Sequence, residues 1–273
     1  MKYFSFVLFL LVSSPVFAQF SAGDGTPENP WHIRTLEDLI KVSDYPDKHF
    51  IQKANIRKPL TKPLCSDWSR KFTGSYNGNG YLINLAIDIK DTLLHPAALF
   101  AFVSGNAVIK NVVTTGYVRG WAFVAGIVAL ALPTVDGTAQ ILNCINNAEL
   151  SINLERVGSI SGIADGNTKN LVSNKNLNLG TILSSSQTAI ISGVVRNSTW
   201  EGAITLSNSI NSGLIVDNST WSDLANGTGG VASVLFPQNN FLKKLFQCIN
   251  TGVIINNSNA NPPRIIKGIA HTP

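Results

Sequence analysis

The histidines are the first place to look for metal binding or proton transfer in this sequence. There are four of them: His32, His49, His95 and His271. None is followed, three or four residues later, by a second histidine or a carboxylate, the spacing that puts two ligands on one face of a helix. Only His49 lies near two carboxylates, Asp44 and Asp47, in a stretch that we predict to be a loop. The sequence therefore predicts no metal site, and no cofactor is assigned.

Carboxylates are the second candidate group, because glycoside hydrolysis needs two of them about 5–9.5 Å apart. Beyond residue 137 the chain holds Glu149, Glu155, Asp165, Glu201, Asp217 and Asp223. Asp165 and Glu201 both follow a Gly-apolar-apolar block, but at different distances from its glycine. Asp88 and Asp91 are close together, yet lie at a predicted strand end. A polysaccharide lyase or glycosidase is thus an alternative that rests on fold analogy alone.

Motifs for a serine nucleophile or for phosphate binding are not found. Residues 158–162 read Gly-Ser-Ile-Ser-Gly, with the serines at the wrong offsets for a nucleophile elbow. Residues 227–230 are rich in glycine but lack the lysine of a phosphate-binding loop. We therefore assign no catalytic, cofactor-binding or metal-binding residue, and we predict a non-enzymatic protein.

The feature that must position any site is a repeat. A glycine followed by two small or β-branched residues recurs at Gly126, Gly162, Gly193, Gly230 and Gly268, in steps of 36, 31, 37 and 38 residues. A second block, Asn-x-small-x-apolar, begins at Asn146, Asn178, Asn211 and Asn250, and Thr114 lies 32 residues before its first copy. A period of this length is typical of a solenoid, whose units bury their apolar faces only against neighbouring units.

The composition favours parallel strands in that solenoid. Short runs rich in Ile, Val and Leu are separated by Gly and Asn, and only 14% of the residues are charged. We predict strands at about 81–89, 99–103, 107–113, 116–119 and 123–130, then about three in each repeat. The repeated glycine should mark a corner where a Cβ would crowd or a positive φ is needed, and the asparagines could stack in ladders. A two-layer β-sandwich is the alternative fold, but it requires no fixed period.

Three stretches together resemble the GLUG-repeat family of bacterial exported and surface proteins. They are the entry segment GDGTPENPWHIRTLEDL, the segment FTGSYNGNGYLINLAI (72–87) and the segment ALFAFVSGNAVIKNVVTTGYVRG (98–120). Ala98 and Ala101 stand where the family usually has glycine, and Asn77 stands where Asp is common. The resemblance covers nearly all of the mature chain and weakens after about residue 150. It implies an all-β fold, a right-handed parallel β-helix, and exposure at or beyond the cell surface, but no chemistry.

The chain divides into three predicted parts. Residues 1–18 are typical of a signal peptide, with Lys2 before an apolar run and Val-Phe-Ala before the cut at Gln19. Residues 19–71 form an N-terminal cap with a short helix at about 36–43, begun by Thr35 and Asp38; residues 44–71 are otherwise expected to be irregular. Residues 72–273 form the β-solenoid repeats. No segment is long and apolar enough for a membrane span.

Three cysteines occupy the chain: Cys65, Cys144 and Cys248. The last two hold the same place in their repeats, about three rungs or roughly 14 Å apart at the strand spacing of about 4.8 Å. A disulfide needs Cα atoms within about 7 Å, so we predict buried, unpaired thiols.

Three features bear on partners. The insertion 236–247 is interpreted as an amphipathic flap, and the strings Asn-Ser-Thr-Trp ending at Trp200 and Trp221 are interpreted as local packing. Residues 264–270 form a strand with no cap after it, which leaves an open edge and suggests end-to-end self-association.

The net charge is +5, and its basic residues are scattered, which argues against nucleic acid as a partner. We therefore predict a secreted or surface-exposed bacterial module for adhesion or another extracellular interaction. The periplasm is the alternative location. Its partners would be glycans or host surface and matrix proteins. A structural spacer is the second alternative.

Overall fold

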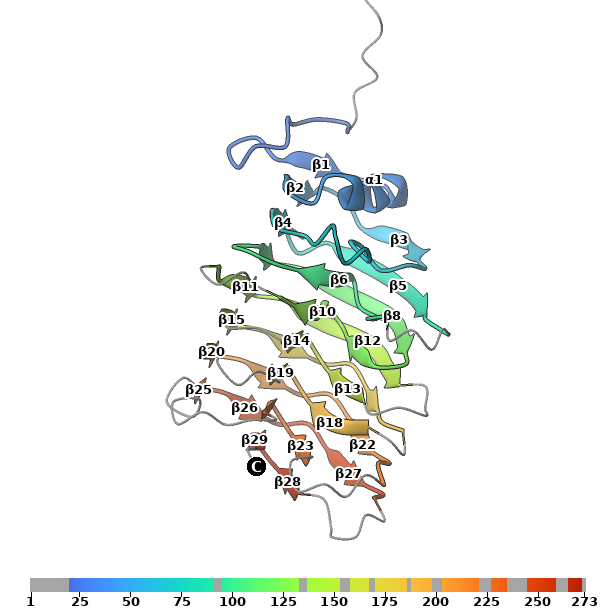
Figure 1. Cartoon of the computed structure of the whole chain (residues 1–273), viewed down its shortest axis with the longest axis vertical. Coiled ribbons are helices and arrows are strands. Elements are labelled where there is room, and N and C mark those ends of the chain that lie inside the picture. Colours follow the sequence, from blue (N-terminus) through green and yellow to red (C-terminus); the bar gives the residue numbers. More distant parts are fainter. Residues whose placement is uncertain are drawn as a thin grey trace, which may run out of the picture.

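The fold is a stack of short strands. The computed structural model describes residues 20–90, 95–132, 137–152, 158–166, 170–185, 188–197, 203–220, 227–234, 245–258 and 265–271. One short helix, α1 (Leu36–Lys41), leads into the 3₁₀ turn η1 (Val42–Asp44); the other regular elements within these ranges are strands. All strand pairs between described residues are parallel, and the strands follow one another down a single axis (Figure 1). The chain is therefore a parallel β-solenoid with a short helix near its N-terminal end, as predicted.

The strands belong to four sheets, each listed from the N-terminal end. The eight-stranded sheet contains β1 (Trp31–Ile33), β2 (His49–Gln52), β4 (Ser75–Asn77), β7 (Val108–Lys110), β11 (Ala139–Leu142), β15 (Asn170–Asn174), β20 (Ala203–Ser207) and β25 (Leu245–Phe246). The ten-stranded sheet contains β3 (Ile56–Leu60), β5 (Leu82–Asp88), β8 (Val113–Gly120) and β12 (Ile145–Ile152). It then divides into β16 (Leu177–Asn178), β21 (Ile210–Asn211) and β26 (Ile249–Asn250), and β17 (Ile182–Leu183), β22 (Ile215–Asp217) and β27 (Ile254–Asn256).

The other two sheets begin further down the stack. The six-stranded sheet contains β6 (Phe100–Val103), β10 (Val128–Ala131), β14 (Ala164–Gly166), β19 (Val195–Asn197), β24 (Ala232–Val234) and β29 (Ala270–His271). The five-stranded sheet contains β9 (Phe123–Ala125), β13 (Gly158–Ser161), β18 (Thr188–Ser192), β23 (Gly227–Gly229) and β28 (Ile265–Lys267). One coil thus visits all four sheets before the chain returns one level lower.

Equivalent positions of the predicted repeats pair with one another in the ten-stranded sheet. Thr114 pairs with Asn146, Asn146 with Asn178, Asn178 with Asn211, and Asn211 with Asn250. The side chains of the first four are buried and face the interior. Each asparagine donates through Nδ2 to Oδ1 of the next one over 2.8–2.9 Å, and Thr114 donates to Asn146 at the top. The predicted asparagine ladder therefore exists, inside the solenoid.

The repeated glycines make room for this ladder. A Cβ on Gly162 would overlap the carbonyl oxygen of Gly193 in the next coil and would lie 2.6 Å from Cγ of Asn178. Gly193 stands in the same relation to Gly230 and to Asn211. Neither glycine has a positive φ. Of the two reasons predicted for these glycines, close approach is therefore the one that operates.

At a second corner of the coils the backbone has a positive φ, and most residues at this corner are asparagines. Five stacked residues have φ between 50° and 55°: Asn111, Asn143, Lys175, Asn208 and Gln247. Asn111 donates to Asn77, and Asn143 donates to Asn111, so a second ladder runs along the outside of this corner. Asparagine tolerates the left-handed region better than other residues with a Cβ, which explains its abundance here.

The interior changes along the axis. Near the N-terminal end it is filled by rings: Phe50, Phe72, Tyr76 and Phe100 are all buried and contact one another at centroid distances of 4.9–6.3 Å. Lower coils are filled by smaller side chains such as Ile160 and Ile191. Each fully buried side chain of this size contributes about 1.5–3 kcal/mol relative to exposure.

The N-terminal helix is confirmed in detail, and one prediction beside it is wrong. The Thr35 hydroxyl accepts from the Asp38 amide, and the Asp38 carboxylate accepts from the Thr35 amide, which completes a capping box. Residues 44–71, predicted to be irregular, contain β2 and β3, which pair with β1, β4 and β5. The prolines misled the prediction, because Pro59 lies inside β3, where an edge strand tolerates it.

The cysteines are unpaired, as predicted. Cys65 and Cys144 are buried, and Cys248 is half-buried. The register Ile145–Leu177–Ile210–Ile249 places Cys144 and Cys248 three coils apart.

Several predictions lie outside the described residues. They concern the signal peptide, most of the insertion 236–247, and the two tryptophans of the Asn-Ser-Thr-Trp strings. No helix within the described ranges is long and apolar enough to cross a membrane.

Candidate functional site

The site that stands out is built by the loop between β3 and β4. This loop is anchored near both ends, on β6 and on Leu99, the residue just before β6. The Leu64 amide donates to the Leu99 carbonyl over 2.8 Å, and the Phe72 amide donates to the Phe102 carbonyl over 3.0 Å. Between these anchors the chain leaves the strand layer and passes over the outer side of the six-stranded sheet.

Trp68 is presented at the outer end of this loop by a local turn. The Asp67 carboxylate accepts hydrogen bonds from the Ser69 amide over 2.8 Å and from the Ser69 hydroxyl over 2.7 Å. The Arg70 amide closes the turn on the Asp67 carbonyl over 3.0 Å. These Ser69 hydrogen bonds lower the pKa of the Asp67 carboxyl below its usual range. An ionised Asp67 therefore fixes the backbone on both sides of Trp68.

The floor of the site is an apolar cluster on the outer face of the sheet. Phe102 of β6 pairs with Leu130 of β10, and both are almost fully buried, at 4% and 6% exposure. Phe123 of β9 packs against this cluster. The Trp68 ring meets Phe102 edge-on at a centroid distance of 5.1 Å, yet 59% of Trp68 remains exposed.

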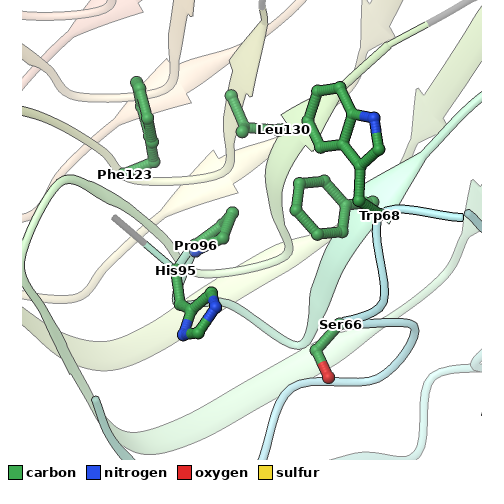
Figure 2. A pocket seen from close by; sticks show the side chains of 7 residues that line it. Ser66, Trp68, His95, Pro96, Phe123 and Leu130 are labelled. Carbon is green, nitrogen blue, oxygen red and sulfur yellow. The ribbon is translucent and has the colours of Figure 1, made fainter. Parts of the chain in front are cut away.

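The resulting pocket has a volume of about 350 Å³. It is lined by Ser66, Trp68, His95, Pro96, Phe102, Phe123 and Leu130. Figure 2 shows Trp68 across the hollow from Phe123 and Pro96, with His95 and Ser66 at its rim. The Lys71 ammonium lies 4.7 Å from the centre of the Trp68 ring. An apolar hollow with a few polar groups at its edge is the usual form of a small-ligand site.

The residues of this pocket are suited to bind a ligand. An exposed indole ring stacks on the apolar face of a sugar or packs on an aliphatic or aromatic side chain, while the polar rim groups fix orientation. The described residues that line the pocket include no carboxylate. Within the residues that the structure describes, no group of three His, Cys, Asp or Glu side chains is arranged to hold a metal ion.

Comparison with known proteins agrees with the fold. No protein-family model matches the chain. A crystal structure from Bacteroides ovatus, described as a "putative immunoglobulin A1 protease", superposes with a TM-score of 0.61 over 93% of this chain and 87% of that one. The two sequences are 16% identical, so the likeness shows the solenoid fold alone.

One curated protein is related in part of its sequence. A protein of Evansella cellulosilytica named "Putative Gly-rich membrane protein" is 32% identical over 107 residues, which is 36% of this chain. This chain covers 12% of the length of that relative. The match therefore extends to a segment of a much larger protein.

The structure places the four histidines apart. His32 is half-buried in β1, and its Nδ1 has no hydrogen-bond partner among the described residues. Desolvation is the main cause that lowers the pKa of His32, and the charges of Lys53 and Arg34 lower it further. His49 lies in β2, not in a loop as predicted, and its Nδ1 is 2.8 Å from Oγ of Ser75. His95 lies at the Trp68 pocket, and the side chain of His271 is not among those described.

The carboxylates that the sequence offers for hydrolysis are also dispersed. Asp88 pairs with Lys90 at 3.6 Å, and Asp91 lies outside the described residues. Glu149 pairs with Arg119 of the coil above at 3.7 Å. Asp217 is fully buried and accepts from the Thr228 hydroxyl over 2.6 Å. The side chains of Asp165 and Glu201 are not described.

A second hollow lies between α1 and the segment that follows β3. It has a volume of about 250 Å³ and its lining includes Ile40, Asp44, Pro59 and Lys62. Ile40 is 51% exposed there. The described lining holds one carboxylate, Asp44, and no aromatic ring, so this hollow offers less for ligand recognition than the Trp68 pocket.

Sequence reasoning did not identify Trp68. The signal was present in Asp67-Trp68-Ser69, since Asp followed two residues later by Ser is a local turn pattern. The floor residues Phe102, Phe123 and Leu130 come from β6, β9 and β10, and only the register of these strands in the folded chain brings them beneath the loop.

Proposed function

We propose that this protein is an exported bacterial binding module that recognises glycans through the Trp68 pocket. The observation that carries the proposal is the 59% exposed indole of Trp68, held by an anchored loop at the edge of an apolar hollow. A fixed aromatic ring loses little entropy on binding, and such rings dominate the energetics of many interfaces.

The wider assignment rests on the sequence. The pattern of residues 1–18, typical of a signal peptide, supports export from the cytoplasm, and the resemblance to GLUG repeats supports the cell surface. The name of the Evansella cellulosilytica relative fits association with the cell envelope. A structural spacer, the competing function, has no need for an exposed ring over an apolar hollow.

The test is retention of the full mature chain on a panel of immobilised polysaccharides and host matrix proteins at physiological salt. We expect retention on one class of polysaccharide. The variant Trp68→Ala should weaken binding by about 10- to 100-fold, the loss of a central aromatic contact worth about 1.4–3 kcal/mol. Trp68→Phe should retain part of the affinity because a ring remains.

The matched control is Ile40→Ala, which removes an exposed apolar side chain from the second hollow and should leave binding unchanged. Unchanged circular dichroism of both alanine variants ensures that the fold is intact. Equal binding by Trp68→Ala and the wild type would refute the site. Retention only at low salt would show nonspecific attraction to a basic protein, and release of cleavage products would favour the lyase or glycosidase alternative.

A further inference from the structure

The loop that carries Trp68 is basic. Residues 61–71 contain one acidic residue, Asp67, and three basic residues: Lys62, Arg70 and Lys71. The Asp67 carboxylate is directed into its own turn, where the Ser69 amide and the Ser69 hydroxyl both donate to its Oδ1. The loop therefore carries more positive than negative charge close to the Trp68 pocket.

The strand register places Lys71 beside the floor of the pocket. Phe72 pairs with Val103 in a parallel bridge, and both side chains belong to the buried core. One residue earlier in each chain, Lys71 is level with Phe102, and the alternation of side chains directs both to the outer face of the sheet. The Lys71 ammonium lies 4.7 Å from the centre of the Trp68 ring. A cation is thus held next to the aromatic ring of the pocket.

Arg70 is held in place by the backbone of a neighbouring segment. Its Nη2 donates to the Asp44 carbonyl over 2.7 Å, and the residue is exposed. A guanidinium has five N–H donors, so four remain for another acceptor. A carbonyl oxygen carries no formal charge, so this hydrogen bond orients the guanidinium without neutralising it. Arg70 is therefore a preorganised cation on the same loop as Trp68.

The charges of Arg70 and Lys71 are not neutralised by ion pairs within the described part of the chain. Basic side chains elsewhere in it lie 3.0–3.7 Å from a carboxylate oxygen, as in Lys48, Lys58, Lys90 and Arg119. Arg70 and Lys71 have no such partner among the described residues. The described lining of the pocket also includes no carboxylate. Charge complementarity at this pocket therefore favours an anionic ligand.

The neutral groups of the pocket are those that a sugar ring needs. The exposed indole of Trp68 is suited to the apolar face of a pyranose. Ser66 and His95 at the rim have side chains that can form hydrogen bonds with hydroxyl groups. A sugar with an apolar face, hydroxyl groups and one carboxylate matches the ring, the rim and the cations together.

We propose that the Trp68 pocket selects carboxylated glycans, that is, polymers of hexuronic acid. The pyranose ring stacks on Trp68, and its carboxylate pairs with the Lys71 ammonium and the Arg70 guanidinium. This inference rests on the glycan-binding function proposed above and names the class of glycan. A neutral glycan of the same shape leaves both cations without a partner, so charge discriminates between the two.

The test uses hyaluronate, alginate and polygalacturonate, each beside the methyl ester of the same polymer, at physiological salt. We expect the full mature chain to bind one acidic polymer at least about tenfold more tightly than its ester. Lys71→Gln should weaken binding of that polymer at least about fivefold and leave binding of the ester unchanged, because the amide has no charge. Lys71→Arg keeps the charge and should keep most of the affinity.

Lys175→Gln is the matched control, because it removes the same charge from an exposed lysine in another coil. It should bind like the wild type. Equal losses for Lys71→Gln and Lys175→Gln would overturn the inference, because they would show general attraction to a basic protein. Equally tight binding of dextran sulfate, which has no carboxylate, would overturn it as well.

Two further outcomes separate this inference from the proposed function. If acid and ester bind equally well, or if only neutral polysaccharides bind, and Trp68→Ala still weakens binding, the selection for carboxylates is wrong and glycan binding at the pocket stands. If Trp68→Ala binds every polymer as the wild type does, the pocket is not the site and both proposals fail.

Discussion

The side-chain amide of Asn178 donates to Oδ1 of Asn211, 33 residues later in the chain, over 2.8 Å inside the solenoid. Both side chains are fully buried. The same bond recurs above and below, so each asparagine both donates to the next coil and accepts from the previous one. A buried amide is costly without partners, and this ladder satisfies it only when the coils stack in one register.

The first prediction concerns that ladder. Asn178→Ala removes the acceptor for Asn146 and the donor for Asn211, which leaves two buried polar groups without their bonds. Each such group costs about 1–3 kcal/mol, so the free energy of unfolding should fall by about 3 kcal/mol. Urea unfolding followed by far-ultraviolet circular dichroism measures this loss.

Its control is an asparagine pair of the same kind on the surface. The Asn257 side chain donates to Oδ1 of Asn218 in the neighbouring coil over 3.0 Å, and both residues are exposed. Asn257→Ala should cost less than about 0.5 kcal/mol, because water replaces the lost bond. Equal losses for the two variants would show that burial of the ladder has no special effect.

The second prediction concerns the glycine beside Asn178. Gly162→Ala places a methyl group against the Gly193 carbonyl and against Cγ of Asn178, whose side chain is held by its hydrogen bond to Asn211. Overpacking of this kind costs about 1–3 kcal/mol, and the urea midpoint should fall accordingly. Gly268→Ala adds the same methyl where nothing lies within 4 Å, and its midpoint should match that of the wild type. Equal midpoints for both variants would contradict the close-packing account.

The solenoid could be predicted because its causes repeat. The phase of Gly126, Gly162 and the later glycines, together with the Asn blocks, is enough to indicate coils of about 32–38 residues and their register. The capping residues Thr35 and Asp38 specify the helix locally. Such local or periodic patterns can be recognised in a single sequence, because each repeat carries the same residues at the same positions.

The candidate site could not be predicted in the same way. Trp68 is not part of the repeat, and the prolines around it predicted an irregular segment. The loop that carries Trp68 is positioned because Leu64 and Phe72 pair with residues of β6. Phe102 and Leu130 meet beneath it through strand pairing between different coils. These contacts are long-range and do not repeat, so no spacing in the sequence records them.

The third prediction is a stabilising change at the left-handed corner. Lys175 has a φ of 55° at a place that Asn143 and Asn208 fill in adjacent coils. A left-handed conformation costs an ordinary residue about 1–2 kcal/mol, and asparagine pays part of this through local hydrogen bonds. Lys175→Asn should raise the free energy of unfolding by about 0.5–1 kcal/mol. Lys175→Ala keeps the unfavourable conformation and should show no such gain; a gain of equal size there would point to lost charge instead.

The last prediction concerns the cysteines and alkaline pH. Burial raises the pKa of Cys144 and of Cys65 to about 12 from an ordinary value of 9.0. The folded state therefore keeps these thiols protonated where the unfolded state would ionise them. The contribution of these two thiols to the free energy of unfolding is therefore fully present below pH 9, and it should be lost as the pH rises toward 12.

Two measurements check this pH dependence. The unfolding free energy of Cys144→Ala should fall less steeply above pH 9 than that of the wild type, because one of the two strongly shifted thiols is gone. Labelling with a thiol reagent at pH 8 should modify Cys248, which is half-buried, well before Cys65 and Cys144. Rapid labelling of Cys144 in the folded protein, or identical slopes for the two proteins, would contradict burial of this thiol between the coils.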